Sequence, residues 1–228
     1  MSLLILALET ALQTCSVALT DNDKLLALVE AEGRFMHAEK ITLFIEDALA
    51  DAGKNVKDID LICVSKGPGS YTGLRIGVSA AKGLAFGLGT PLVSVSTLEG
   101  LTVGALLKHE NKEALFCPMI DARRMEIYTS VYNSDCQIVE DASAKIVYEN
   151  TFAELLAENQ IYFFGDGMEK CRHLLEKHSN AYFIDNVKPS ATYLIPSAIK
   201  LFEAGKFENL LTFEPYYMKD FFTFAKTE

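Results

Sequence analysis

One helix, expected over residues 72–89, constrains the fold of this chain more than any other stretch. An apolar run rich in β-branched residues at 59–65 precedes it and ends in a glycine–proline turn at 67–69. This pattern predicts a buried strand, then a turn and a helix. The helix carries only two charged residues, Arg75 and Lys82. Because a helix that is apolar nearly all round is normally buried on more than one side, we expect it to be covered by more than one neighbour.

Four glycines make the same helix unusual. Each of Gly73, Gly77, Gly83 and Gly87 costs a helix about 1 kcal/mol relative to alanine, so close packing should offset the loss. Small residues allow another backbone to approach closely. Two explanations are open at this point. The helix packs tightly on the chain's own sheet, or it forms a subunit interface.

The first part of the chain, residues 1–108, is predicted to form a first lobe. The helix expected at 38–52 is amphipathic, with its apolar residues on one stripe and Leu43 on the opposite side. The expected strands are at 3–9, 15–20, 25–32, 59–65 and 91–96, and the expected helices are at 38–52, 72–89 and 98–108. This order, β-β-β-α-β-α-β-α, is an α/β layout.

The second part, residues 109–228, begins where the pattern turns polar and repeats the same order. Strands are expected at 114–120, 126–132, 137–140, 161–164 and 181–184, and helices at 151–158, 168–178 and 190–204. A duplicated unit would give two lobes with a cleft between them. The last helix or the tail is expected to pack back on the first lobe.

Composition and charge exclude several classes of protein. The chain has 228 residues, a net charge of −10 and a pI of about 4.9, whereas an autonomous nucleic-acid binder needs a basic face. No apolar run could span a bilayer, and the apolar start at 1–8 has no basic segment and reads as a strand, not a signal peptide. Five scattered cysteines without a CxxC pair indicate reduced thiols. We therefore expect a cytoplasmic protein with no membrane partner.

Few residues suggest chemistry. The loop at 67–73 faces a helix N-terminus, which favours anions, but a P-loop lysine is missing and Thr72 stands where the Rossmann pattern needs glycine. Ser70 has no nucleophile elbow around it and is expected to cap the helix. The four histidines lack the spacing of a helical metal pair. Glu9 and Asp121 each end a strand, where the carboxylate could face the cleft or serve a turn.

Five stretches of the chain resemble the TsaB family. They are Leu-Glu-Thr at 8–10, Gly-Pro-Gly-Ser-Tyr-Thr-Gly-Leu-Arg-Ile-Gly at 67–77, Ser-Thr-Leu-Glu-Gly-Leu at 96–101, Asp-Ala-Arg-Arg-Met-Glu-Ile-Tyr at 121–128 and Pro-Tyr-Tyr-Met-Lys at 215–219. TsaB proteins take part in making threonylcarbamoyladenosine at position 37 of bacterial tRNA. The resemblance implies an actin/hexokinase/Hsp70-like (ASKHA) fold of two lobes and a non-catalytic subunit.

The resemblance also implies partners. The subunit would bind and activate TsaD, the catalytic paralogue, and the ATPase TsaE would join that heterodimer. It would form a homodimer when alone and would reach tRNA only through the complex, with no cofactor, metal or catalytic residue of its own. The family interface would use the helices at 38–52 and 72–89. The expected partner-binding residues, with the two acidic ones facing the two basic ones across the interface, are Leu43, Glu46, Asp47, Arg75, Gly77, Ser79, Ala80, Lys82, Gly83 and Phe86.

The departures from related patterns favour a subunit without catalysis. Thr97 and Leu101 stand where TsaD-like proteins carry two metal-binding histidines, and neither is a good ligand. The segment after the first strand lacks the glycine of the active relatives' phosphate loop, and Lys219 replaces the usual arginine of the TsaB tail. Two alternatives are a stand-alone nucleotide hydrolase or M22-type metallopeptidase, suggested by the fold resemblance, and a tRNA-binding module, which the acidic charge disfavours.

Overall fold

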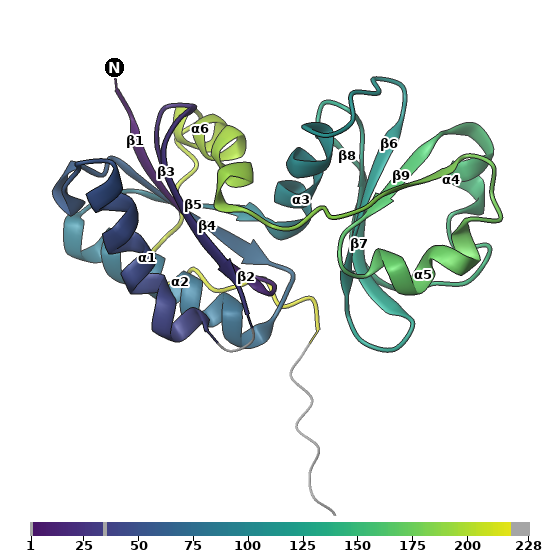
Figure 1. The fold of residues 1–228 in the computed structure, drawn as a ribbon, viewed down its shortest axis with the longest axis horizontal. Coiled ribbons are helices and arrows are strands. Elements are labelled where there is room, and N and C mark those ends of the chain that lie inside the picture. Colours follow the sequence, from purple (N-terminus) through teal and green to yellow (C-terminus); the bar gives the residue numbers. More distant parts are fainter. Residues whose placement is uncertain (1, 34–35, 220–228) are drawn as a thin grey trace, which may run out of the picture.

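The chain forms two lobes that lie side by side, each built around a five-stranded sheet (Figure 1). The computed structural model describes residues 2–33 and 36–219. Within these ranges, no helix is both long enough and apolar enough to cross a membrane.

The first sheet has the strand order β3-β2-β1-β4-β5. Its central strand β1 pairs antiparallel with β2 and parallel with β4. The elements are β1 (Leu4–Glu9), β2 (Thr14–Asp21), β3 (Lys24–Glu32), α1 (His37–Asp51), the short 3-10 helix η1 (Val56–Asp58), β4 (Leu61–Gly67), α2 (Tyr71–Leu88), β5 (Leu92–Ser96) and α3 (Thr97–Leu106).

The second sheet has the order β10-β9-β6-β7-β8, which matches the first sheet element for element when it is read from the other edge. The elements are β6 (Leu115–Asp121), β7 (Glu126–Tyr132), β8 (Ile138–Ile146), α4 (Ala153–Glu158), β9 (Ile161–Phe164), α5 (Met168–Leu175) and β10 (Ala181–Ile184). The two-lobed α/β fold of duplicated units is therefore confirmed.

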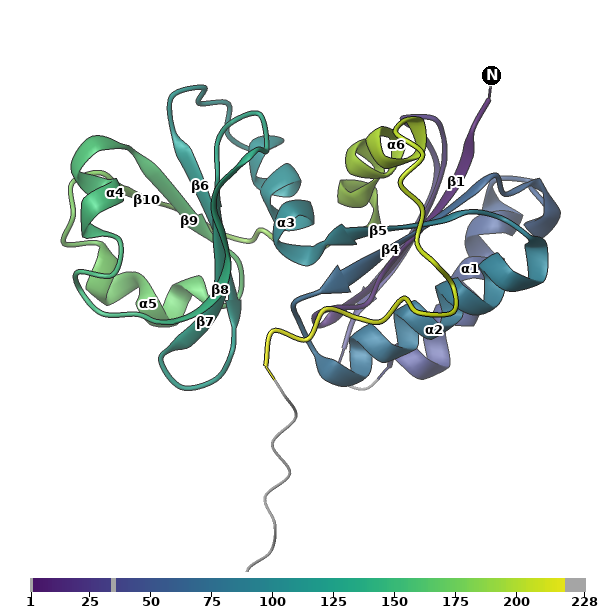
Figure 2. The same ribbon diagram turned by 180° about the vertical axis from the view of Figure 1, so that it is seen from behind.

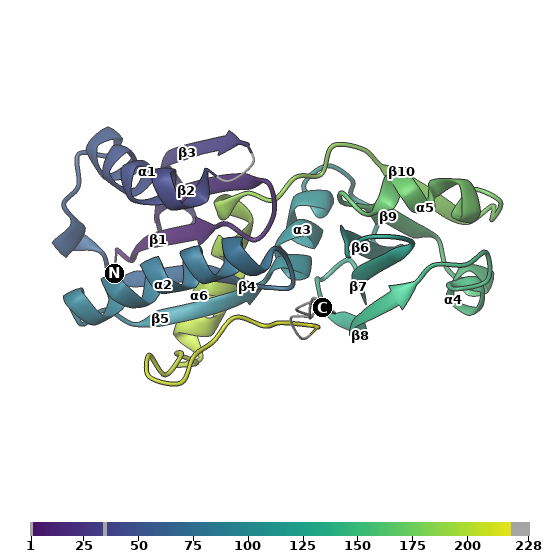
Figure 3. The same ribbon diagram turned by 90° about the horizontal axis from the view of Figure 1, so that it is seen from below.

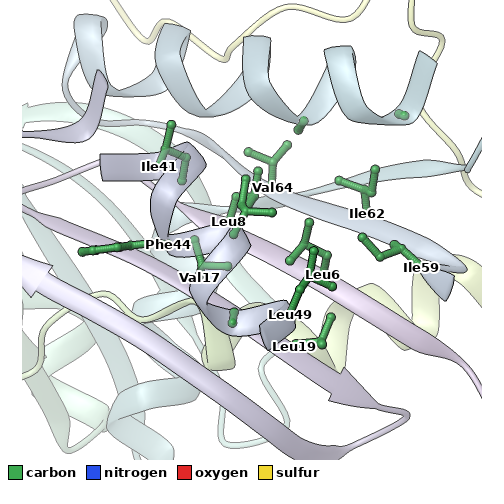
Figure 4. Close-up of a cluster of buried hydrophobic side chains, with 14 of the residues drawn as sticks. Leu6, Leu8, Val17, Leu19, Ile41, Phe44, Leu49, Ile59, Ile62 and Val64 are labelled. Atoms are coloured by element: carbon green, nitrogen blue, oxygen red, sulfur yellow. The ribbon is translucent and has the colours of Figure 1, made fainter. Parts of the chain in front are cut away.

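The central strands of the first sheet are buried on both faces because helices cover both (Figure 3). Side chains alternate along a strand, so Leu8 of β1 points to one face and Ala7 to the other. Figure 4 shows Ile41 and Phe44 of α1 in one cluster with Leu8 and Val17. Ala7 lies instead in a separate buried cluster on the opposite face. Apolar runs of this kind are typical of a sheet packed on both sides.

After β10 the chain returns to the first sheet. The 3-10 helix η2 (Ala191–Leu194) and α6 (Ile195–Glu203) cover the face opposite α1 and α2. Residues 205–219, which we call the C-terminal strap, then run along α2 towards the second lobe (Figure 2). Helix α3 lies between the sheets, and its Leu98 and Leu101 pack on Phe116 of the second sheet.

Two elements differ from the sequence-based expectation. The helix expected over 190–204 is split, because Pro196 lies in the first turn of α6, a position that tolerates a missing N–H. Strand β8 extends to Ile146, well beyond the expected 137–140. Its outer half pairs with β7, with Ile146 opposite Glu126, but the charged and alanine residues of this edge strand hide the alternation.

Candidate functional site

The end of β1 is closed to the cleft. Glu9 is only 1% exposed, and its Oε1 accepts hydrogen bonds from the Ala11 N–H (2.6 Å) and the Ser65 hydroxyl (2.8 Å). Burial raises the pKa of Glu9 to about 7, against the opposing effect of these hydrogen bonds. Of the two roles expected for this carboxylate, facing the cleft is wrong. Glu9 instead fixes the turn after β1 and ties it to β4.

Three glycines let α2 and its preceding loop lie directly on the β1–β2 turn. A Cβ atom added at Gly69 would come 2.4 Å from the Ala11 carbonyl oxygen, and one at Gly73 would come 2.2 Å from that of Thr10. At Gly77 it would come 2.2 Å from the Thr10 hydroxyl oxygen, which itself donates to the Gly73 carbonyl at 2.8 Å. The turn is therefore filled by the chain's own helix, with no room there for a phosphate.

The other two glycines of α2 face open space. A Cβ at Gly83 or Gly87 would meet nothing within 4 Å. Phe86 between them is 81% exposed, and Leu43 on neighbouring α1 is 49% exposed. Tight packing within the chain thus explains the glycines in the first half of the helix, and the glycines of the second half are left uncovered. We call a set of eight exposed residues on the two helices the open face, and its members are Leu43, Glu46, Asp47, Arg75, Ser79, Gly83, Phe86 and Gly87.

The structure separates the expected partner-binding residues into two groups. Seven of the ten belong to the open face: Leu43, Glu46, Asp47, Arg75, Ser79, Gly83 and Phe86. Gly77 is buried against Thr10 and cannot reach another chain, and Ala80 is half-buried against the core. Lys82 is also half-buried, and its Nζ donates to the Phe213 carbonyl at 2.7 Å.

Arg75 is consequently the cation of the open face. Its guanidinium lies 5.1 Å from the ring centre of Tyr71, and its Nη1 donates to the Tyr71 hydroxyl at 3.0 Å. A guanidinium held over an aromatic ring keeps its charge and its outward donors. Glu46 and Asp47 are exposed on α1, so the open face carries charges of both signs together with the apolar side chains of Leu43 and Phe86.

The C-terminal strap covers the flank of α2 that faces away from α1. Phe213 is 8% exposed and packs in the core between the first sheet and helices α1 and α2. The Tyr216 N–H donates to the Lys66 carbonyl at 2.7 Å. The Tyr217 ring centre lies 4.7 Å from that of Tyr71. The tail was expected to pack back on the first lobe, and it lies there. Its individual contacts were not predicted, because aromatic residues in a tail have no periodicity that indicates where they pack.

The strap also reaches the second lobe, where Lys219 forms an ion pair with Glu126. Between the lobes lies a groove of about 680 Å³. Its lining includes Lys66, Ser96 and Glu99 from the first half of the chain, Tyr132 from the second sheet and Lys200 from α6. Burial raises the pKa of Tyr132. No sequence motif marked this groove, because its lining comes from six separate elements and the strap.

The positions corresponding to the TsaD-like metal pair do not fit a metal. Thr97 and Leu101 on α3 are each 1% exposed, and both pack inside the protein. Across residues 2–33 and 36–219, no group of three or more histidine, cysteine, aspartate or glutamate side chains could hold a metal ion.

Two lobes with duplicated mixed sheets define a two-lobed α/β protein built from a repeated unit. Residues 33–204 match the family model "TsaD: tRNA N6-adenosine threonylcarbamoyltransferase". The chain is 33% identical to the tRNA threonylcarbamoyladenosine biosynthesis protein TsaB of Escherichia coli, over 95% of this chain and 94% of that one. It is 32% identical to the TsaB of Bacillus subtilis, over 72% of this chain and 64% of that one.

A solved structure from Pseudomonas aeruginosa, of an uncharacterized protein with similarity to peptidase YEAZ, superposes with a TM-score of 0.81. That structure is 23% identical to this chain and covers 95% of it and 100% of its own length, which shows the same fold. The chain belongs to the TsaB family.

Proposed function

We propose that this chain is a non-catalytic subunit required for threonylcarbamoyl modification of adenosine 37 in tRNA. In this role it binds and activates a TsaD-type threonylcarbamoyltransferase. Membership of a family whose relatives are named for threonylcarbamoyladenosine biosynthesis supports the pathway. One structural observation carries the subunit role: the second half of α2 presents Gly83, Phe86 and Gly87 to open space instead of packing them.

Two exposed glycines beside an exposed phenylalanine lower the stability of a monomer in which nothing covers them. Each glycine weakens the helix by about 1 kcal/mol, and Phe86 leaves a large apolar ring in water. A partner helix that approaches over Gly83 and Gly87 would contact the backbone closely and bury the ring. Aromatic anchors at the centre of an interface often dominate its binding energy.

Three features support the absence of catalysis. Helix α2 fills the β1–β2 turn through Gly73 and Gly77. Glu9 is used internally, by Ala11 and Ser65. The positions of the TsaD-like metal pair hold a buried threonine and a leucine. The chain would thus act by altering the catalytic subunit, and a TsaE-type ATPase would join only the heterodimer.

The open face also suits a second copy of this chain. A two-fold interface places the same patch on both subunits, and this patch contains both acidic residues, Glu46 and Asp47, and a cation, Arg75. The free protein would therefore form a homodimer through the surface that it uses for the catalytic subunit. Binding of the two partners would then be mutually exclusive.

The test measures binding to the TsaD-type protein of the same cell by calorimetry. Gly83→Leu fills the open space and Phe86→Ala removes the anchor, so each should weaken binding at least tenfold. Leu107→Ala, at a residue that is 74% exposed at the end of α3, is the matched control and should bind normally. Circular dichroism should show all three folded.

Two results would count against the proposal. One is unchanged affinity in both open-face variants, which would remove the assigned surface. The other is turnover of ATP, or zinc-dependent peptide cleavage, by the purified chain alone, which would favour a stand-alone enzyme. The activating role is tested separately, because threonylcarbamoyladenosine formation by the TsaD-type enzyme should require the chain.

A further inference from the structure

The tip of the β6–β7 hairpin in the second lobe holds two arginines in an uncommon backbone conformation. Arg123 has φ 70° and Arg124 has φ 51°, and both side chains are exposed. Residues other than glycine, asparagine and aspartate rarely adopt this left-handed region. Two adjacent arginines there require a surrounding structure that fixes them, and strained positions of this kind concentrate at functional sites.

A network beneath the tip supplies that support. Asp121 accepts a hydrogen bond from the Arg123 N–H at 2.8 Å, and its own N–H donates to Asp166 at 2.9 Å. Lys170 of α5 pairs with Asp121 and donates to the Glu126 carbonyl at 2.7 Å. The lysine thus neutralises the carboxylate that holds the turn.

Lys219 of the strap pairs with Glu126, the next acidic residue of the hairpin. Both carboxylates of the hairpin are therefore matched by lysines. Within residues 2–33 and 36–219, neither the Arg123 nor the Arg124 guanidinium forms a hydrogen bond or an ion pair. The two exposed guanidiniums therefore carry positive charge that the described acidic groups of this tip do not pair with, although the chain as a whole has a net charge of −10.

The duplicated fold provides an internal comparison. In the first lobe Glu9 accepts from the Ala11 N–H, as Asp121 accepts from the Arg123 N–H in the second. Gly165 and Gly167 bring the start of α5 against β6, as Gly69 and Gly73 bring α2 against the β1–β2 turn. The framework is shared, but the equivalent β1–β2 turn of the first lobe, at 10–13, carries no arginine, so the fold alone does not require them.

We propose that Arg123 and Arg124 bind phosphates of the RNA backbone when tRNA is held by the assembled complex. The inference rests on the proposed function, because the chain alone is acidic and should bind RNA weakly. Guanidinium groups match phosphate oxygens with paired hydrogen bonds. The hairpin lies in the second lobe, away from the open face on α1 and α2 (Figure 1), so it stays accessible when that face is covered.

Tyr217 of the strap, two residues before Lys219, contacts Tyr71 of α2 with the two rings tilted against each other. Aromatic rings near basic groups are typical of surfaces that contact nucleic acid.

The experiment titrates an unmodified tRNA transcript onto the reconstituted complex at several salt concentrations. The main variant is Arg123→Asn with Arg124→Asn, because asparagine tolerates the left-handed region and should leave the fold intact. Its affinity should fall at least about tenfold at low salt, and the slope of log affinity against log salt should fall by about 1.4 to 1.8, as expected for two lost phosphate contacts.

Two further variants make the result specific. Lys54→Asn with Lys57→Asn removes the same charge from exposed positions around η1 and should change neither affinity nor slope. Arg123→Lys with Arg124→Lys should restore the slope but not the full affinity, because lysine keeps the charge and loses the paired geometry. Gel filtration first establishes that each variant enters the complex.

The outcomes separate this inference from the proposed function. A complex that forms but binds tRNA with the same affinity and slope in the asparagine variant overturns the arginine site. ATP that displaces tRNA from the arginines at an equimolar concentration also overturns it, because the site would then serve a small phosphate compound. If the chain forms no complex with the TsaD-type protein, the proposed function fails. In that case tRNA is titrated onto the lone chain at low salt, and the inference is decided by the same difference in salt slope between the native chain and the asparagine variant.

Discussion

Helix α2 offers a matched pair of substitutions that should change the free energy of unfolding in opposite directions. At Gly77 an added Cβ would lie 2.2 Å from the Thr10 hydroxyl oxygen, whereas at Gly83 it would meet nothing within 4 Å. Both Gly77→Ala and Gly83→Ala remove a helical glycine, which is worth about 1 kcal/mol to the helix. Only the first must displace a buried neighbour.

The cost at Gly77 follows from what Thr10 does. Its hydroxyl donates to the Gly73 carbonyl at 2.8 Å in a fully buried site. Forcing this side chain aside adds overpacking of about 1–3 kcal/mol and leaves a buried hydroxyl unpaired, at about 1–3 kcal/mol. After the helix gain of about 1 kcal/mol, Gly77→Ala should destabilise the first lobe by about 1–5 kcal/mol. Gly83→Ala should stabilise it by up to about 1 kcal/mol.

Urea unfolding followed by far-ultraviolet circular dichroism is the suitable assay, since the chain contains no tryptophan. A rescue variant checks the mechanism: adding Thr10→Ala to Gly77→Ala removes the obstructing hydroxyl and should recover part of the loss. Residues in direct contact show such coupling, while distant ones add independently. Thr10→Ala combined with Gly83→Ala should therefore show none.

Equal stability of Gly77→Ala and Gly83→Ala, or an equal effect of Thr10→Ala in both backgrounds, would contradict this prediction. Either result would mean that α2 does not lie on the β1–β2 turn as closely as the 2.2 Å approach requires. The filled turn would then no longer argue against a phosphate site.

Three shorter predictions concern burial. Burial raises the pKa of Glu9 to about 7 from 4.5, so its contribution to stability is complete below pH 4.5 and is lost as the pH rises through 7. In Glu9→Gln, which keeps the acceptor oxygen, the urea concentration at the unfolding midpoint should change less between pH 4.5 and 7. Phe213→Ala should cost about 3–5 kcal/mol and expose the strap to limited proteolysis, whereas Leu211→Ala, at an 89% exposed residue, should do neither. Burial raises the pKa of the Cys117 thiol to about 12 and of Cys15 to about 11, so a thiol reagent at pH 8 should label these cysteines slowly until urea unfolds the chain.

The sequence predicted the elements of this fold well where a period or a turn signal was strong. The stripe on 38–52 placed Leu43 outside the core, and Ser70 caps α2 by accepting from the Gly73 N–H at 3.3 Å. The assignment of individual partner-binding residues was less reliable. Gly77 and Gly83 are the same residue type on the same helix, and what distinguishes them is that Gly77 lies against Thr10 and Gly83 does not. Such a contact depends on long-range packing, which no local pattern encodes.

The duplicated unit shows which part of α2 the fold itself needs. Its counterpart α5 has 8 residues and turns charged side chains outward, where Arg172 pairs with Glu169 and Asp185. Helix α2 has 18 residues, and both packing glycines, Gly73 and Gly77, lie within its first eight. The further ten residues contain every α2 member of the open face except Arg75. Ala81, Ala85 and Leu84 of this extension pack in the core of the first lobe itself. What the lobe leaves unused is the exposed side with Gly83, Phe86 and Gly87, which is the part that the proposed function assigns to a partner.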